Sequence, residues 1–189
     1  MGPEEASAWW AFVARALLSA DRDALAELAG SLPPAPGLPT PDELAASLEG
    51  DSLDLEREYV RLFLHPDGAP CAPWQSAWAP EPQLMGEAHR LALQWFRRAG
   101  IEPKQANEPA DHAGLLAAFW SAWLLPGAPA SERASFFDQH LAWMDRFATA
   151  IASHARHPFY RALAQILGTL LAAARREFST APAERPQTC

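Results

Sequence analysis

The apolar residues of this sequence recur at the spacing of one helix face in segment after segment. In the first segment the apolar side holds Trp9, Phe12, Val13, Ala16 and Leu17. β-branched residues are scarce, and the strict alternation that is typical of strands is nearly absent. The pattern therefore predicts an all-α fold.

Proline-rich stretches divide the first half of the chain. A second, weaker helix is expected over residues 21–32, and "PPAPGLPTP" follows as a linker. Thr40 with Pro41 and Glu43 forms a capping box, which starts a short helix. A stronger helix carries Leu55, Tyr59, Leu62 and Phe63 on one face and ends at Pro66. Residues 65–82 contain too many prolines for any helix.

The second half predicts four more helices. The first places Leu84, Ala88, Leu91, Trp95 and Phe96 on one face and ends at Gly100 in a left-handed cap. The second opens at "EPADH", residues 108–112. The third runs to about His154, with an apolar face made of Phe137, Leu141, Met144, Phe147 and Ile151. The last begins at Pro158 and carries Phe159, Leu163, Ile166 and Leu170.

The chain has 189 residues, which suits one domain with a real hydrophobic core. We expect a single helical bundle over residues 1–178. The terminal "STAPAERPQTC", residues 179–189, is expected to be disordered.

Charge and composition narrow the class of partner. The net charge of −8 argues against nucleic acid and allows a basic partner such as a peptide. Charged residues interrupt the apolar stripes, so we expect no stable insertion in a membrane. The N-terminus is acidic, unlike a signal peptide, and Cys71 and Cys189 form no CxxC pair. A cytoplasmic location is expected.

The "EPADH" stretch puts two acids and a histidine immediately before the most apolar run. A residue before proline avoids the helical region, so Glu108 is expected as the N-cap and Pro109 as the first helical residue. Asp111 is then the third helical residue. Its carboxylate would meet the positive end of the helix dipole, an effect worth about 0.3–1 kcal/mol.

His112 has Leu116, Phe119 and Trp123 at i+4, i+7 and i+11, so the spacing places it on the apolar face. A buried imidazole needs a hydrogen-bond partner, and Glu108 is one candidate. A lone histidine on an apolar face is more often a core residue than a ligand or a catalyst.

Catalytic and cofactor signatures are weak. No serine or cysteine lies in a recognisable nucleophile context, and no GxxxxGK[ST] loop is present. His154 and His157 have the spacing of a metal-binding pair on a helix, but Pro158 interrupts the helix there, and no third metal ligand is obvious. We expect no catalytic residue, no metal and no cofactor. A hydrolase or metal-dependent enzyme using Asp111 and His112 stays as an alternative.

Two segments in this order carry a family resemblance. "EYVRLFLHPDGAPCAPWQSAW" contains an aromatic-x-x-Leu-Phe pattern in Tyr59, Leu62 and Phe63, and "NEPADHAGLLAAFWSAWLL" contains an E-P-x-D-H pattern. The chain resembles the TorD/DmsD family of redox-enzyme maturation proteins, whose hallmarks these are. Residues 140–167 look like the C-terminal helix pair of that family, so the likeness covers most of the chain.

"APWQSAW" most resembles the DmsD branch, in which a Pro-Trp-x-Ser-x-Trp run follows the Leu-Phe segment. Trp74, Ser76 and Trp78 match that run. Two positions depart from the branch: Gln75 stands where many relatives carry an acid, and Asp67 stands where DmsD-like members carry an aromatic residue.

The resemblance implies a cytoplasmic chaperone that is not an enzyme. Such a protein binds the twin-arginine signal peptide of a molybdenum-cofactor oxidoreductase of the DMSO or TMAO reductase type. It assists maturation of the precursor before export. Some family members bind guanine nucleotide, so the resemblance adds guanine nucleotide as a candidate ligand.

The expected signal-peptide site takes its residues from both motifs and from the loop between them. A twin-arginine signal has two arginines and then an apolar stretch, so its receptor needs an apolar groove with acids nearby. Alternatives remain for several side chains: Leu62 and Phe63 suit the core, the two tryptophans suit loop anchors, and a helical adaptor for folded proteins would use the same aromatic loop. The expected site consists of Tyr59, Leu62, Phe63, Trp74, Ser76, Trp78, Glu108, Pro109, Asp111 and His112.

Overall fold

A computed structural model describes residues 1–66, 68–101, 108–125 and 127–180. Within these ranges every regular element is a helix, and the one β-type pairing is an isolated bridge between Trp74 and His112. The predicted all-α fold is confirmed.

The helical elements follow one another with short connections. They are α1 (Pro3–Leu18), α2 (Arg22–Gly30), α3 (Pro41–Ser47), α4 (Ser52–Tyr59), the π-helical turn η1 (Val60–Leu64), the 3₁₀ turn η2 (Gln75–Trp78), α5 (Glu87–Arg98), α6 (Ala113–Leu124), α7 (Ala130–Phe136), the π-helical turn η3 (Phe137–Leu141), α8 (Met144–His154) and α9 (Pro158–Thr180). None of the helices in the described ranges is long and apolar enough to cross a bilayer.

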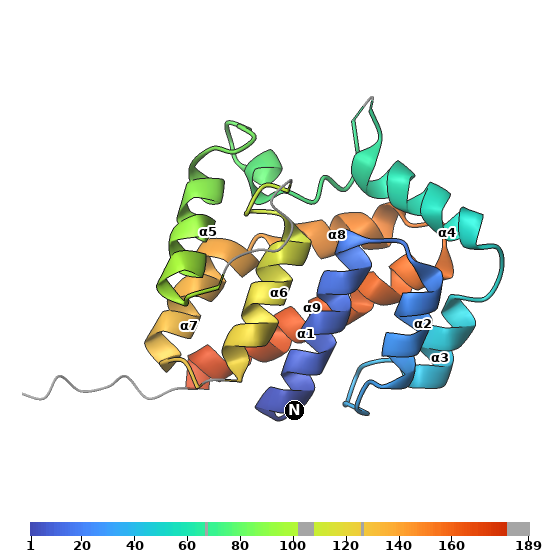
Figure 1. The fold of residues 1–189 in the computed structure, drawn as a ribbon, viewed down its shortest axis with the longest axis horizontal. Helices are drawn as coiled ribbons and strands as arrows, with labels where there is room; N and C mark the ends of the chain where they lie inside the picture. The colour runs from blue at the N-terminus through green and yellow to red at the C-terminus, as the bar shows by residue number, and fades with distance from the viewer. Residues whose placement is uncertain (67, 102–107, 126, 181–189) are drawn as a thin grey trace, which may run out of the picture.

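Helices α1 and α6 lie side by side at the centre of the bundle, and α8 and α9 pack together behind them (Figure 1). Helices α2 and α3 form a pair at one end, where α3 also contacts α9. Helices α5 and α7 lie at the opposite end, on the other side of α6 (Figure 1).

Small residues allow α1 and α6 to approach closely. The Ser7 hydroxyl donates to the Ser121 carbonyl oxygen at 3.0 Å, and the Ser121 hydroxyl donates to the Ser7 carbonyl oxygen at 2.8 Å. Gly114 faces Leu18, and a Cβ atom at this glycine would come 2.6 Å from the Leu18 Cγ atom. This helix pair therefore depends on residues with little or no side chain.

The hydrophobic core is continuous and rich in aromatic rings. Each fully buried large apolar side chain contributes about 1.5–3 kcal/mol relative to its exposed state, so these rings dominate the stability of the bundle. The largest fully buried side chains include Trp9, Trp10, Trp120, Tyr160, Phe12, Phe63, Phe136 and Phe147.

Several predicted start and stop signals are confirmed. The Thr40 hydroxyl accepts from the Glu43 N–H, and the Glu43 carboxylate accepts from the Thr40 N–H, which completes the capping box. Gly100 has a φ of 66° after the end of α5, as expected of a left-handed cap. Pro158 begins α9.

Three local predictions are wrong. The proline-rich stretch 65–82 does contain a helical turn, η2, because a 3₁₀ turn of four residues fits between Pro73 and Pro80. Helix α5 begins at Glu87, so Leu84 lies outside it and is exposed. The expected continuous helix to His154 is divided into α7, η3 and α8.

The predicted terminal boundary falls inside a helix. The disordered tail was expected from residue 179, and α9 extends through Thr180. Residues 181–189 lie outside the described residues, so their expected disorder stays a prediction.

Candidate functional site

The segment before α6 pairs with the segment before η2. The Gln75 N–H donates to the Asp111 carbonyl oxygen at 3.0 Å, and the Ala113 N–H donates to the Pro73 carbonyl oxygen at 2.7 Å. The fully buried Asp111 side chain adds a third link, because its Oδ2 atom accepts from the Ser76 N–H at 2.9 Å. We call this pairing of residues 73–76 with residues 111–113 the motif junction.

The motif junction corrects the predicted start of α6. Helix α6 begins at Ala113 and its N-cap is His112, whose Nδ1 atom accepts from the Gly114 N–H at 3.0 Å. Glu108 is therefore not the N-cap, Pro109 is not the first helical residue, and Asp111 is not in the first turn. Residues 109–112 form a turn, in which the His112 N–H donates to the Pro109 carbonyl oxygen at 2.9 Å, and His112 itself is extended. This backbone hydrogen-bonds to Pro73 and Gln75 rather than continuing the helix.

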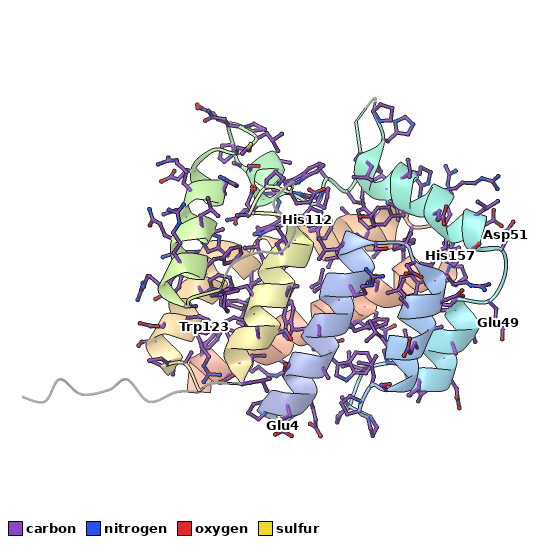
Figure 2. All side chains as sticks on the ribbon, viewed as in Figure 1. Glu4, Glu49, Asp51, His112, Trp123 and His157 are labelled. Atoms are coloured by element: carbon purple, nitrogen blue, oxygen red, sulfur yellow. The ribbon has the colours of Figure 1, made fainter. Side chains whose placement is uncertain are left out.

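His112 is buried as predicted, but its partner is the backbone of Gly114 rather than Glu108. Burial lowers the pKa of His112 to about 4, although the charge of Asp111 opposes that shift. The imidazole is consequently neutral at neutral pH, and its Nδ1 atom is free to accept. Its ring meets the Trp74 ring edge to face at a centroid distance of 6.0 Å. Figure 2 shows His112 at the start of α6.

Histidines of α5 and η3, together with the Gln75 side chain, attach the motif junction to its neighbours. His89 of α5 accepts from the Ala110 N–H at 2.9 Å. The fully buried His140 of η3 places its Nδ1 atom 2.9 Å from the Gln75 Oε1 atom, and the Gln75 amide nitrogen donates to the Gln139 carbonyl oxygen. Burial lowers the pKa of His140 to about 4 despite the charge of Asp111. The junction thus joins α5, η2, α6 and η3.

The motif junction also concentrates buried polar atoms that lack a hydrogen-bond partner among the described residues. They are the Trp74 Nε1, Ser76 Oγ, Asp111 Oδ1 and His140 Nε2 atoms. Such atoms reduce stability, commonly by about 1–3 kcal/mol each. This group of four such atoms marks the region as a candidate functional site.

A groove of about 590 Å³ lies on the surface beside the motif junction. Trp78 and Trp143 form its aromatic part, with ring centroids 6.1 Å apart. Both indoles are held in place: the Trp78 N–H donates to the Ala72 carbonyl oxygen and the Trp143 N–H to the His140 carbonyl oxygen, each at 2.8 Å. The full lining is Gln75, Ser76, Trp78, Ala79, Pro80, Glu81, Gln83, Glu87, Ala88, Leu91 and Trp143.

Charged groups border the aromatic part of the groove. Glu81 and Glu87 belong to its lining and are exposed. The Arg146 guanidinium lies 5.3 Å from the centroid of the Trp78 ring and donates to the Trp78 carbonyl oxygen at 3.2 Å. The face of Trp78 therefore already accommodates one guanidinium group.

Of the ten predicted site residues, Ser76 and Trp78 line the groove. Leu62 and Phe63 are fully buried, in agreement with the alternative that they belong to the core. Trp74 packs on His112 within the motif junction.

Tyr59 of the first motif is held by α1 and by its own motif. Its hydroxyl donates to the Leu17 carbonyl oxygen at 3.0 Å, and its ring packs on Phe63. Burial and then the charge of Glu108 raise the pKa of Tyr59 to about 12. Glu108 and Pro109 are half-buried and precede the motif junction.

Sequence reasoning missed one wall of the groove and one support of the junction. Trp143, Leu91, Glu81 and Glu87 carry no motif, and only the packing of α5 and η3 against η2 brings them together. Gln75 departs from the DmsD pattern, and in the structure its side chain hydrogen-bonds to His140. Asp67, the other departure, lies outside the described residues.

The alternatives based on metal or acid–base chemistry find little geometric support. The described part of the chain contains no group of three or more His, Cys, Asp or Glu side chains arranged to hold a metal ion. His157 instead accepts from the Phe159 N–H at the start of α9. The Asp111 and His112 side chains are both buried and both accept backbone hydrogen bonds.

Comparison with known proteins places this fold and these motifs in a family. The solved structure of a proposed redox enzyme maturation protein from Archaeoglobus fulgidus matches with a TM-score of 0.61 and 21% identity, over 94% of each chain, which supports the fold. The Tat proofreading chaperones DmsD of Salmonella typhi and Salmonella typhimurium are each 38% identical over 121 residues. That match covers 62% of this chain and 59% of the length of each relative.

The sequence model of the nitrate reductase delta subunit family matches residues 15–155, which include both motifs, the groove and the motif junction. The resemblance on which the sequence interpretation depended is thus confirmed. This chain belongs to the nitrate reductase delta subunit family, to which the TorD proteins also belong.

Proposed function

We propose that this protein is a cytoplasmic chaperone that binds the twin-arginine signal peptide of a redox-enzyme precursor in the groove beside Trp78 and Trp143. It acts by binding and not by catalysis. The client is a molybdenum-cofactor oxidoreductase of the DMSO or TMAO reductase type, whose precursor is held until it is ready for export. Family membership and the names of the Salmonella relatives support this proposal.

The observation that carries the proposal is the attachment of the groove to the motif junction. Asp111 binds the backbone of Ser76, and Trp78 follows two residues later at the end of the same 3₁₀ turn. The aromatic surface is therefore fixed before any ligand arrives, so little conformational entropy is lost when a peptide binds. Asp111 and His112 accordingly have a positioning role, whereas Trp78 contacts the peptide and the buried Ser76 forms part of the groove wall.

The chemistry of the groove suits a twin-arginine signal. Aromatic and aliphatic side chains from Trp78, Leu91 and Trp143 offer an apolar surface, and Glu81 and Glu87 offer carboxylates. Burying a few apolar side chains at about 1.5–3 kcal/mol each, less the costs of association, leaves about 8 kcal/mol. That free energy corresponds to a dissociation constant of about 1 μM, which suits reversible escort.

Other predicted residues have supporting places in this proposal. Tyr59, Leu62 and Phe63 belong to the packing beneath the two motifs, and Trp74 holds the junction. Direct contact of Glu108 or Pro109 with the peptide stays a prediction. Guanine nucleotide also stays a prediction, with no residues assigned to it.

The test is a fluorescence anisotropy titration with a labelled peptide that has two adjacent arginines and an apolar stretch of about 12 residues. Trp78→Ala is expected to weaken binding at least about tenfold, since one large aromatic contact is lost. Trp123→Ala is the matched control, because Trp123 is also half-buried and lies near the opposite end of α6 from His112 (Figure 2).

Equal weakening by both variants would mean that lost stability, and not a lost contact, changes the affinity. Binding to folded precursor but not to isolated peptide would favour the helical adaptor. A stoichiometric metal in the purified protein would favour the metal-dependent enzyme.

A further inference from the structure

The turn at residues 83–86 borders the groove and exposes two large apolar side chains. The Gly86 N–H donates to the Gln83 carbonyl oxygen at 3.0 Å, which closes the turn. Leu84 and Met85 between them are 63% and 59% exposed, more than the other large apolar side chains in the described ranges. Gln83, at the start of the turn, lines the groove.

Met85 adopts a backbone conformation that favours glycine. Its φ of 57° is the one positive value at a non-glycine residue among those the structure describes. A residue with a Cβ atom is disfavoured in this region. The turn is also tight, because a Cβ atom at Gly86 would come 2.8 Å from the Gln83 carbonyl oxygen. Glycine at position 85 would relieve the strain, and the Met85 side chain that it removes is mostly exposed.

Two carboxylates flank this turn within the same groove. Glu81 precedes it, and Glu87 follows it as the first residue of α5. In the described ranges neither side chain has an ion-pair or hydrogen-bond partner. By contrast, buried Glu58 and Asp111 hydrogen-bond to backbone groups. Glu81 and Glu87 therefore remain available to an incoming cation.

We propose that residues 81–87, "EPQLMGE", are the element that reads the signal peptide. Glu81 and Glu87 accept the arginine pair, and Leu84 with Met85 packs on the apolar stretch that follows it. This inference rests on the proposed function, and it assigns the arginine pair to acids outside the E-P-x-D-H motif. A basic and apolar peptide suits this turn, because free acids lie beside exposed apolar side chains. A second copy of the chain suits it less, because its net charge is also −8.

The experiment measures the affinity for the same labelled peptide and the thermal midpoint of each variant. Met85→Gly is expected to weaken binding about three- to tenfold, through loss of one apolar contact, while its midpoint is no lower than that of the wild type. Leu53→Ala is the control, because Leu53 is an exposed apolar residue on α4, away from the groove. It is expected to leave the affinity unchanged.

The charge test is a cycle between two protein forms and two peptides. Replacing the peptide's arginine pair by glutamines is expected to weaken its binding to the wild type about three- to tenfold. The same replacement is expected to change the affinity of Glu81→Gln/Glu87→Gln at most about twofold, because the carboxylates that accept the arginines are already absent. Glu4→Gln/Glu49→Gln removes the same charge from exposed positions distant from α5 (Figure 2), and its response to the glutamine peptide is expected to match that of the wild type.

The outcomes separate this inference from the proposed function. The inference would be overturned, and the proposed function left intact, by three results together. The wild type binds the peptide at micromolar concentration, Met85→Gly binds it equally well, and Glu81→Gln/Glu87→Gln loses as much affinity as the wild type when the peptide's arginines are replaced. No binding of the wild type to the peptide would overturn both. A concentration-dependent dimer that dissociates in Met85→Gly would assign the turn to a second copy and overturn the inference.

Discussion

The carboxylate of Glu58 holds α4 to the connection between α8 and α9, and its removal gives a quantitative test of the fold. Its Oε2 atom accepts from the Arg61 Nε atom at 2.7 Å, and its Oε1 atom accepts from the backbone N–H groups of Arg156 and His157. Burial alone would raise the pKa of Glu58, but the hydrogen bonds from Arg61 and the two backbone groups outweigh burial and lower the pKa to about 2.

This difference from the ordinary value of 4.5 corresponds to about 3 kcal/mol of stability. Because the folded pKa lies below the unfolded one, the contribution is complete above about pH 5 and is lost as the pH falls toward 2. Glu58→Gln is therefore expected to lower the free energy of unfolding by about 3 kcal/mol at pH 7 and by about 1 kcal/mol near pH 3.

Urea unfolding followed by circular dichroism at both pH values measures these differences. Glu56→Gln, an exposed carboxylate on the same helix, is the control and is expected to change the free energy of unfolding by less than about 0.5 kcal/mol. A Glu58→Gln variant as stable as the wild type at pH 7, or a difference that does not shrink in acid, would refute the reasoning.

Two further predictions concern α6. Gly114→Ala is expected to destabilise the protein by about 1–3 kcal/mol in urea unfolding, because the new Cβ atom would come 2.6 Å from Leu18 Cγ and 3.1 Å from the Ala14 carbonyl oxygen. Gly168→Ala in α9, where nothing lies within 4 Å, is expected to stabilise it by about 0.5–1 kcal/mol, and equal effects of both changes would contradict this packing. Burial holds the pKa of His112 at about 4 in the folded protein, so the unfolded chain takes up its proton first as the pH falls below 6.5 and stability declines. His112→Asn keeps an N-cap acceptor but does not titrate in this range. Between pH 7 and pH 5 this variant is therefore expected to lose about 2 kcal/mol less unfolding free energy than the wild type. Equal losses would argue against a buried neutral imidazole.

The sequence predicted those parts of the fold whose signals are local. The capping box at Thr40, the left-handed cap at Gly100 and the proline start at Pro158 each depend on neighbours within a few residues, and each is confirmed. The apolar spacing likewise identified the main helices, because burial of one face dominates their stability.

The errors lie where distant segments pair. The start of α6 was predicted at Pro109 and lies at Ala113, because the backbone of residues 111–113 hydrogen-bonds to residues 73–75. Helix-start rules use only nearby residues and contain no information on such pairing. The same limit applies to the groove. Trp78 was predicted for the site from its loop, whereas Trp143 was assigned to no site, since only the tertiary packing of η3 and α8 against η2 places it there.

The groove takes its lining from three separate stretches: residues 75–83, the first turns of α5, and Trp143 before α8. Its aromatic pair is therefore incomplete until the ribosome has synthesised the chain through Trp143. A newly made copy would complete this groove only after η3 and α8 have docked on η2. A molecule cleaved before η3 would lose Trp143 from the groove, together with His140, which hydrogen-bonds to Gln75.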